Sequence, residues 1–461
     1  MPTINTVLDT IDADLDNALD RLKGFLRVPS ISTDPAFADK CSEAADWLVA
    51  ELTTIGFTAQ RHNTPGHPMV VAKSPKTDSG KKTLLFYGHY DVQPVDPLDL
   101  WSRDPFDPQI EQQNGHDVIR GRGSADDKGQ LMTFVEACRA WQQVHGELPP
   151  NLTLFFEGEE ESGSPSLVPF MQNHKELLAA DLALVCDTGM WNVETPSIST
   201  MLRGMVGEEI TLTGPSRDLH SGMYGGPAIN PIRVLTRILA DLHADDGRVQ
   251  LPGFYEGVEE LPPAVKDQWQ SLGLDETEFL ADVGLSRPAG ENGYSVLEQI
   301  WSRPTCEING ISGGYTGEGF KTVLPSKAIA KLSFRLVGQQ DPDKISDELY
   351  KWVEERLPED CTASFKSKDG SPATVMPIDD PVFGKTLQAL TDEWPKPAVY
   401  MGCGGSIPVV GYIKDILDID SLLVGFGLDD DAIHSPNEKY NVSSFHKGTR
   451  SWARIIEAIH A

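Results

Sequence analysis

The sequence feature that constrains the fold most is an apolar run that ends in a cluster of acids. Residues 151–164 read Asn-Leu-Thr-Leu-Phe-Phe-Glu-Gly-Glu-Glu-Glu-Ser-Gly-Ser. The apolar half predicts a buried strand, and the glycines predict a turn that presents the glutamates at its end. Carboxylates so close together raise one another's pKa values unless a bound cation supplies the opposite charge. Taken alone, the cluster is more simply read as a solvated acidic loop, so a cation site depends on the rest of the chain.

Length and charge exclude several classes of protein. The 461 residues suffice for two or three domains, and 69 acidic against 39 basic residues give a formal charge of −30. Such a charge repels phosphate backbones, so we expect no nucleic acid partner. Residues 1–27 predict an amphipathic helix rather than a secretory signal, and no stretch has the apolar length of a membrane span. The six cysteines form no Cys-x-x-Cys pattern, which favours reduced thiols and a cytoplasmic location.

Predicted strands and helices alternate along residues 1–199, and polar residues follow each strand. The expected helices span 1–27, 42–55 and 130–143, and the expected strands span 83–87, 152–156 and 181–186. This alternation is typical of an α/β sheet whose site lies along one edge of the strands.

From about residue 200 the pattern changes. Alternating apolar and polar residues at 207–213 and 327–337 predict half-exposed antiparallel strands. Between them, 231–243 is helical and 251–304 is an acidic insertion punctuated by prolines. The α/β pattern then returns with a helix at 382–391, a strand at 421–426 and a helix at 444–460. We therefore predict an α/β domain from residues 1–199 and 381–461, with a central mixed sheet flanked by helices, and an α+β domain inserted at 200–380.

Polar side chains at five strand or loop ends are candidates for convergence: His89, Asp126, Glu160 or Glu161, Asp187 and His434. Imidazole together with carboxylate suits Zn, Mn or Co, whereas a calcium site uses oxygen alone. The number of ligands suggests two ions bridged by one acid, which share a water and polarise a carbonyl. Each residue also has a simpler interpretation. A lone histidine usually forms hydrogen bonds in the core or at the surface without binding a metal, and Asp126-Asp127 fits a plain helix N-cap.

Six segments, in order along nearly the whole chain, resemble one family of enzymes. They are Gly88-His-Tyr-Asp91, Gly121-Arg-Gly-Ser-Ala-Asp-Asp-Lys-Gly129, Glu157-Gly-Glu-Glu-Glu-Ser-Gly163, Arg217-Asp-Leu-His-Ser-Gly222, Lys321-Thr-Val-Leu-Pro325 and His434-Ser-Pro-Asn-Glu438. Together they are similar to the dinuclear metallopeptidases that include glutamate carboxypeptidases, aminoacylases, desuccinylases and dipeptidases, and the branch they resemble most is the cytosolic, carnosinase-like dipeptidases. The resemblance implies a catalytic domain interrupted by a lid and dimerisation domain.

The resemblance also implies a role for each residue of the centre. Asp126 would bridge two metal ions, with His89 and Asp187 on one ion and Glu161 and His434 on the other. Glu160 would be the general base, Asp91 would tune His89, and the peptide bond after Asp126 would be cis. The extra acid Glu159 makes the choice between Glu159 and Glu160 depend on counting back from Ser162-Gly163. Zn is the expected metal, with Mn or Co as alternatives.

The inserted domain is expected to dimerise and to complete the site. His220 and Thr322 would reach the partner subunit's active site, where His220 would polarise the scissile carbonyl. Arg335 would pair with the terminal carboxylate of the substrate. The loop that ends in Gly404, Gly405 and Ser406 would bind that carboxylate through backbone N–H groups and the serine hydroxyl.

The leading hypothesis is a homodimeric, metal-dependent hydrolase that cleaves the amide bond of dipeptides or similarly small peptides. One alternative keeps the chemistry but acts on N-acyl or N-succinyl amino acids, although the long segment 231–304 favours the dipeptidase branch. Another alternative is a non-catalytic binding or scaffold protein on the same fold. A serine or cysteine hydrolase is disfavoured, because neither a nucleophile elbow with a triad nor an activated cysteine is evident.

Overall fold

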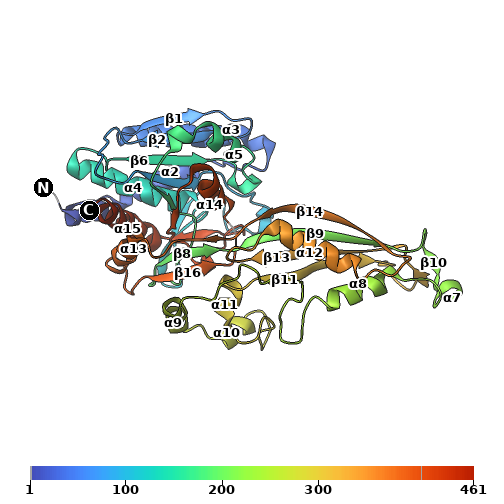
Figure 1. Cartoon of the computed structure of the whole chain (residues 1–461). Coiled ribbons are helices and arrows are strands. Elements are labelled where there is room, and N and C mark those ends of the chain that lie inside the picture. The colour runs from blue at the N-terminus through green and yellow to red at the C-terminus, as the bar shows by residue number, and fades with distance from the viewer. Residues whose placement is uncertain (1–2, 406) are drawn as a thin grey trace. The chain divides into compact units, whose positions relative to one another are not determined.

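The computed structural model describes residues 3–405 and 407–461, which divide into two compact units (Figure 1). Unit 1 runs up to Thr200 and includes Met376–Met401 and Tyr412–Ala461. Unit 2 comprises Met201–Val375 and Gly402–Gly411. The segment Gly402–Gly411 therefore groups with unit 2, whereas the sequence analysis assigned it to the returning part of the first domain.

A mixed sheet forms the centre of unit 1, as the sequence predicted. Its strands follow the order β1-β2-β6-β3-β7-β17-β8, and β6, β3, β7 and β17 run parallel. The bounds are β1 (Thr58–His62), β2 (Met69–Lys73), β3 (Leu84–His89), β6 (Leu152–Glu157), β7 (Leu182–Val185), β8 (Ser197–Leu202), β16 (Val399–Cys403) and β17 (Ser421–Leu423), where β16 pairs with β8. The last two residues of β8, Met201 and Leu202, belong to unit 2 and pair with β15 (Thr374–Val375) of that unit. A second sheet, of order β18-β5-β4, contains β4 (Gln109–Gln113), β5 (His116–Arg120) and β18 (Lys439–Asn441).

Helices cover both faces of the central sheet. Successive side chains of β3 point to opposite faces, and since both faces carry apolar residues, each face packs against a helix. Phe86 stacks on Phe134 of α4 with 3.9 Å between ring centroids. The next residue, Tyr87, contacts Phe155, which in turn stacks on Phe170 of α5. The helices of this unit are α1 (Ile4–Ala13), α2 (Leu15–Leu26), α3 (Ala38–Thr54), α4 (Lys128–His145), α5 (Leu167–Asn173), α6 (Lys175–Leu178), α13 (Pro381–Thr391) and α15 (Val442–His460).

The single helix predicted over residues 1–27 is wrong, because the chain forms two helices that meet at Asp14. Asp14 has φ −102° and ψ 7°, which interrupts the helical backbone. Its carboxylate accepts hydrogen bonds from Asn17 and from Arg21, both at 2.6 Å. Aspartate competes in this way with the backbone for local hydrogen bonds, which favours helix ends over helix interiors.

Unit 2 is built on an antiparallel sheet of order β11-β13-β9-β14. Every second residue of β9 and β13 is buried, and the buried face packs against α8 and α12. Helix α12 is also held by Glu208 of the buried face, which accepts hydrogen bonds from Ser346 and Tyr350. The strands are β9 (Gly204–Thr213), β10 (Leu219–His220), β11 (Thr305–Gly313), β12 (Val323–Leu324), β13 (Lys327–Leu336) and β14 (Thr362–Ser371), and the helices are α7 (Ser221–Tyr224), α8 (Pro231–Ala240), α9 (Pro263–Ser271), α10 (Glu276–Ala281), α11 (Val296–Trp301) and α12 (Pro342–Glu354).

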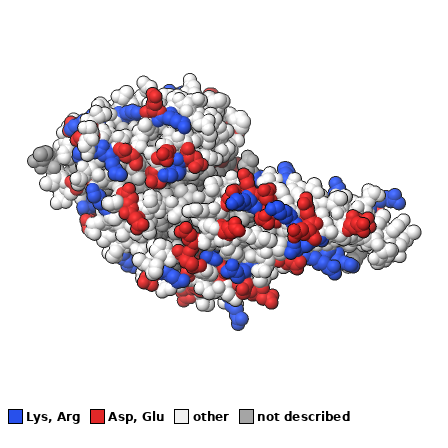
Figure 2. Space-filling model, viewed as in Figure 1, with Lys and Arg blue, Asp and Glu red and all other residues white. Residues whose placement is uncertain are grey.

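Short helical segments complete the described chain. They are α14 (Pro408–Tyr412), the π-helix η4 (Ile413–Leu417), and the 3₁₀ turns η1 (Pro35–Phe37), η2 (Leu98–Leu100), η3 (Glu160–Ser162) and η5 (Asp429–Asp431). Among the helices formed by residues 3–405 and 407–461, none has both the length and the hydropathy that a membrane span requires. Acidic and basic side chains are interspersed on the face shown in Figure 2. The six cysteines are free thiols.

Candidate metal centre

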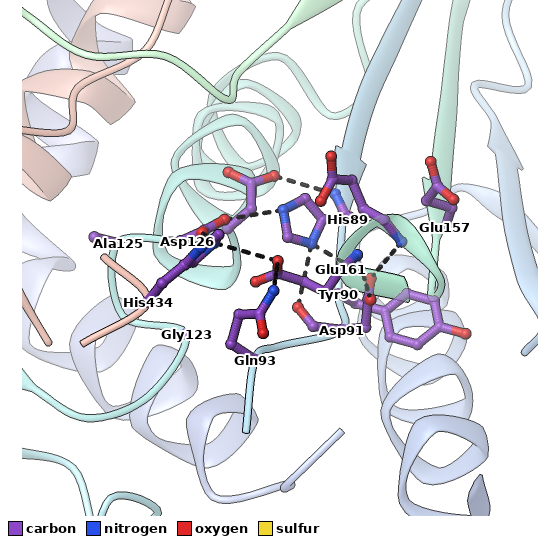
Figure 3. A network of polar contacts seen from close by, with 12 residues as sticks. His89, Tyr90, Asp91, Gln93, Gly123, Ala125, Asp126, Glu157, Glu161 and His434 are labelled. Carbon is purple, nitrogen blue, oxygen red and sulfur yellow. Dashed lines mark hydrogen bonds and ion pairs between the residues drawn. The ribbon is translucent and has the colours of Figure 1, made fainter. Parts of the chain in front are cut away.

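The carboxyl ends of the parallel strands deliver the predicted metal ligands. His89 is the last residue of β3, Glu161 lies in the turn after β6, and Asp187 follows β7. Neighbouring parallel strands end at the same edge of a sheet, so side chains that are far apart in sequence meet there. Two groups form among the described residues, His89 with Asp126 and Asp187, and Asp126 with Glu161 and His434, and within each group the ligand atoms lie within 4.8 Å of one another. Figure 3 shows His89, Asp126, Glu161 and His434 of these groups.

Asp126 belongs to both groups because its two carboxylate oxygens face different histidines. Oδ1 lies 3.0 Å from Nε2 of His89, and Oδ2 lies 2.9 Å from Nε2 of His434. Nε2 of His434 is also 3.2 Å from Oε2 of Glu161. Ligands of a tetrahedral ion with bonds near 2.0–2.1 Å stand about 3.3 Å apart, so these three separations, together with the mixed nitrogen and oxygen donors of both groups, fit a divalent metal.

The charges of the centre also fit a cation. Hydrogen bonds to Asp126 and Glu161 raise the pKa of His434 to about 10. Burial raises the pKa of Asp187 to about 6. Burial lowers the pKa of His89, but its contacts with Asp126 and Asp91 outweigh this and hold it well above its ordinary value. The cluster therefore retains protons unless another positive charge replaces them, which is the role a bound metal fills.

Asp91 supports the centre from behind the ligands. It is fully buried, and its Oδ1 lies 3.4 Å from Nδ1 of His89. Oδ1 also accepts the backbone N–H of Glu160 at 3.2 Å, and Oδ2 accepts that of Glu161 at 3.0 Å. The sequence analysis connected Asp91 with His89 alone, so the contact with the turn after β6 is an additional finding.

The three adjacent glutamates have different environments, which separates Glu159 from Glu160. Glu159 is buried, and its two oxygens accept the backbone N–H groups of His67 at 2.8 Å and Ser166 at 2.9 Å. A side chain at Gly66 would collide with this carboxylate, since its Cβ would stand 1.5 Å from Oε1. Glu160 is half-buried, and burial raises the pKa of its carboxyl group to about 8. Glu159 thus connects the turn after β6 to the backbone at His67 and Ser166, whereas Glu160 lies beside the predicted metal ligands.

The peptide bond between Asp126 and Asp127 is cis, as the resemblance implied. Asp127 occupies the N-cap position of α4, but its side chain forms no capping hydrogen bond. Its Oδ2 instead accepts the backbone N–H of His89 at 3.1 Å. The simple N-cap interpretation of this pair is therefore wrong, because the buried carboxylate is used to hold the end of β3.

Half-buried Gln93 and buried Glu438, two groups beside the ligands, were missed by sequence reasoning. The amide of Gln93 donates a hydrogen bond of 2.6 Å to Oε2 of Glu161. Glu438 receives hydrogen bonds from Arg122 and from the loop that carries Asp126. Glu438 ends the motif that was singled out for His434, so the sequence could have marked Glu438 as a residue of the centre. Gln93 lies in none of the six motifs, so the sequence did not mark it.

The residues predicted to bind substrate lie in unit 2, apart from Ser406, which falls outside the described residues. His220 and Thr322 are both exposed, on and beside the paired strands β10 and β12. The backbone carbonyl of Thr322 accepts the N–H of Ser221 at 3.0 Å. Nδ1 of His220 accepts the N–H of Gly222 at 3.0 Å, which leaves Nε2 directed away from the turn.

A second arginine, Arg203, lies near the predicted carboxylate-binding residues. Arg203 directly precedes β9, in which Met205 pairs with Arg335 of β13. Burial and the charge of Arg335 lower the pKa of Arg203 to about 10. Arg203 holds the glycine loop, since Nε donates to the carbonyl of Gly404 at 3.0 Å and its backbone N–H donates to that of Gly405 at 3.1 Å.

Known proteins resemble the chain over almost its whole length. The family model described as Peptidase family M20/M25/M40 matches residues 85–458. The Cys-Gly metallodipeptidase DUG1 of Candida albicans is 31% identical over 97% of this chain and 96% of its own length. The Beta-Ala-His dipeptidase of Homo sapiens is 26% identical over 98% of this chain and 92% of its own length. The solved structure of the di-peptidase Dug1p from Saccharomyces cerevisiae has a TM-score of 0.78 and 27% identity, and the match covers 99% of this chain and 98% of that one.

Proposed function

The chain belongs to peptidase family M20/M25/M40 and is a metal-dependent peptidase, and we propose that its substrates are dipeptides with a free terminal carboxylate. The family resemblance predicted from six motifs is confirmed. Relatives named as dipeptidases match nearly all of this chain, which supports dipeptides over longer peptides. The observation that carries the mechanism is the pair of ligand groups that share Asp126.

Two divalent ions per subunit are the proposed cofactor. His89, Asp126 and Asp187 would hold one ion, and Asp126, Glu161 and His434 would hold the other. When bound, such a pair of ions lowers the pKa of a water that they share and polarises the scissile carbonyl. Zn is the proposed metal because it binds mixed imidazole and carboxylate sites more tightly than Mn or Co, which remain alternatives set by availability.

Glu160 is the proposed general base. Its carboxylate would accept the proton of the attacking water and then deliver it to the leaving amine, which is the transfer that amide cleavage requires. Both oxygens of Glu159 are engaged by backbone N–H groups, which argues against Glu159 in this role. Asp91 would keep Glu160 in place through the backbone N–H at 3.2 Å.

The terminal carboxylate of the substrate is proposed to bind in unit 2. Arg335, Gly404, Gly405 and Ser406 would contact it, and the neighbouring charge of Arg203 strengthens the attraction.

A homodimer is proposed to complete each active site with His220 and Thr322 of the partner chain. In support, both residues are exposed on or beside the two-stranded sheet β10-β12, and the exposed apolar side chains of Met223 and Phe320 lie within three residues of them in the sequence. Exposed apolar groups of this size are typical of protein interfaces. A cytoplasmic location, predicted from the cysteines, stays a prediction that cell fractionation tests.

An amide-hydrolysis screen on metal-stripped protein tests the proposed function. Dipeptides, their C-terminal amides, N-acetyl amino acids and N-succinyl amino acids would each be assayed with no metal, with Zn²⁺ and with Mn²⁺. We expect metal-restored cleavage of the free dipeptides and weak cleavage of the amides, which lack the terminal charge. Cleavage of only the acylated amino acids would contradict the dipeptide assignment. No cleavage of any of them would favour a binding protein on this fold.

A further inference from the structure

A buried carboxylate holds the loop that carries Asp126, and no function has been assigned to it above. Glu438 is fully buried, and its two oxygens receive hydrogen bonds from four donors. Oε1 accepts the backbone N–H groups of Ala125 at 2.8 Å and Asp126 at 3.1 Å. Oε2 accepts the backbone N–H of Gly123 at 3.0 Å and the guanidinium of Arg122 at 2.7 Å. All four of these donors belong to the segment that leads to Asp126.

The same residue is joined to a second predicted ligand. His434 and Glu438 lie on one short loop, which continues directly into β18. Strand β18 pairs with β5, and β5 leads into the Asp126 loop. The backbone N–H of Gly121 donates to the carbonyl of Glu438 at 3.0 Å, which extends this pairing to Glu438 itself. Backbone pairing and one carboxylate thus connect the two chain segments that supply Asp126 and His434.

Arg122 connects Glu438 to the segment that contacts a third predicted ligand, Glu161. Its Nη2 donates to the carbonyl of Pro94 at 3.1 Å, while its Nη1 is bound to Glu438. The residue before Pro94 is Gln93, whose amide donates to Oε2 of Glu161 at 2.6 Å. The route from Glu438 to Glu161 is continuous through Arg122 and residues 93–94.

We propose that Glu438 is a positioning residue that fixes Asp126 relative to His434 and thereby sets the affinity of the centre for divalent ions. It acts through backbone N–H groups and not as a ligand. The inference rests on the proposed metal centre but not on the proposed substrate. Residues that orient metal ligands from outside commonly change metal affinity by about 10–100-fold when they are mutated.

The variant Glu438→Gln isolates this role because it keeps the shape of the side chain. A glutamine has one acceptor oxygen and an NH₂ group that can only donate. Since four donors converge on the two oxygens, the NH₂ group would face at least two N–H groups whichever way the amide is turned. The Asp126 loop must then shift or leave buried donors without an acceptor.

Glu393 offers a matched control in the same unit. It is also buried and also bound by arginines, with Arg450 at 2.6 Å and Arg454 at 2.9 Å. Its side chain contacts Arg450, Arg454 and Lys447, which all lie on α15 and outside the ligand segments, so Glu393→Gln disturbs a buried carboxylate away from the centre. Both variants are expected to lower the stability of the metal-free protein, whereas only Glu438→Gln should weaken metal binding.

The experiment measures Zn²⁺ affinity of the full-length protein by competition with a chromogenic chelator, without substrate. We expect about 10–100-fold weaker binding for Glu438→Gln and unchanged binding for Glu393→Gln. The visible spectrum of the Co²⁺-loaded proteins gives a second readout, because a displaced ligand changes the absorption bands. Wild-type affinity and spectrum in folded Glu438→Gln would overturn the proposal, and so would an equal loss in Glu393→Gln.

A second variant keeps the test decisive if Glu438→Gln does not fold. Arg122→Lys leaves the carboxylate with its three backbone donors but breaks the link to Pro94, so a smaller loss of Zn²⁺ affinity is expected. Unchanged affinity in that variant would overturn the proposal. A wild-type protein that binds Zn²⁺ but cleaves no dipeptide would refute the proposed substrate alone, whereas failure to bind Zn²⁺, Mn²⁺ or Co²⁺ would refute both.

Discussion

The Asp91 carboxylate accepts the backbone N–H of Glu161 at 3.0 Å, so one buried side chain holds a predicted metal ligand by its main chain. The same carboxylate accepts the N–H of Glu160 at 3.2 Å and lies 3.4 Å from Nδ1 of His89. The end of β3 and the turn after β6 are thus tied together at one residue. This contact explains how a turn that carries several mutually repelling acids keeps a defined geometry.

Replacement of Asp91 by asparagine is expected to weaken the centre without unfolding the protein. Asparagine keeps the size of the side chain but loses one acceptor and the negative charge beside His89. We expect Zn²⁺ affinity to fall by about 10–100-fold, with a parallel fall in kcat/KM at limiting metal. Chelator competition and steady-state kinetics on the same preparation measure both. A variant with normal affinity would show that the backbone contacts hold the turn without the charge.

Glu160→Gln and Glu159→Gln are expected to fail in different ways. Loss of the proposed base should lower kcat by about 10²–10⁴-fold while the folded state and metal content persist. Loss of the Glu159 carboxylate leaves buried backbone N–H groups without full partners and should cost about 1–3 kcal/mol of unfolding free energy. Urea unfolding and single-turnover kinetics separate the two effects. The reverse pattern would reassign the base to Glu159.

Mixing two inactive variants tests whether His220 acts across a dimer. In a mixed dimer of Glu160→Ala and His220→Ala chains, one active site would combine an intact Glu160 with the intact His220 of the partner. Random exchange of equal amounts should then restore about a quarter of the wild-type activity. Exchange is followed by mass spectrometry of differently tagged chains. Activity that stays at background after complete exchange would mean that His220 serves its own subunit, whereas activity of the His220→Ala protein by itself would mean that His220 has no role.

The junction between α1 and α2 gives a pH-dependent prediction. Burial raises the pKa of Asp14, but hydrogen bonds from Arg21 and Asn17 outweigh it and hold the pKa below its ordinary value of 3.8. A depressed carboxyl pKa stabilises the folded state above the unfolded value, and this contribution is lost as the pH falls. Wild type should therefore exceed Asp14→Asn in unfolding free energy at pH 7, and the difference should shrink as the pH falls below 3.8.

The measurement is chemical denaturation of both proteins from pH 7 down to about pH 2.5, which reaches well below the ordinary carboxyl pKa of 3.8. Asp16→Asn serves as a control, because Asp16 lies on the first turn of α2 and is exposed. A difference between wild type and Asp14→Asn that does not change with pH would mean that the carboxylate acts at this junction only by its shape.

Sequence patterns predicted the α/β unit and the side chains that meet in it because strand direction carries that information. A buried apolar run followed by a polar residue marks the end of a strand, and parallel neighbours end at one edge. His89, Glu161 and Asp187 were therefore found from local pattern and motif together. The break at Asp14 was missed, because an amphipathic pattern persists across a kink that the aspartate makes by accepting local hydrogen bonds.

The sequence by itself determined which strands form and which chemical groups stand at their ends, because periodicity and residue type are local properties. Tertiary structure alone decided how those groups are held. Glu159 finds its donors at His67 and Ser166, and Glu438 finds one at Asp126, 312 positions away. The donors are backbone N–H groups, which every residue except proline possesses, so the residue type does not predict which of them will bind a buried carboxylate. Only the folded chain brings a particular carboxylate to a particular set of them.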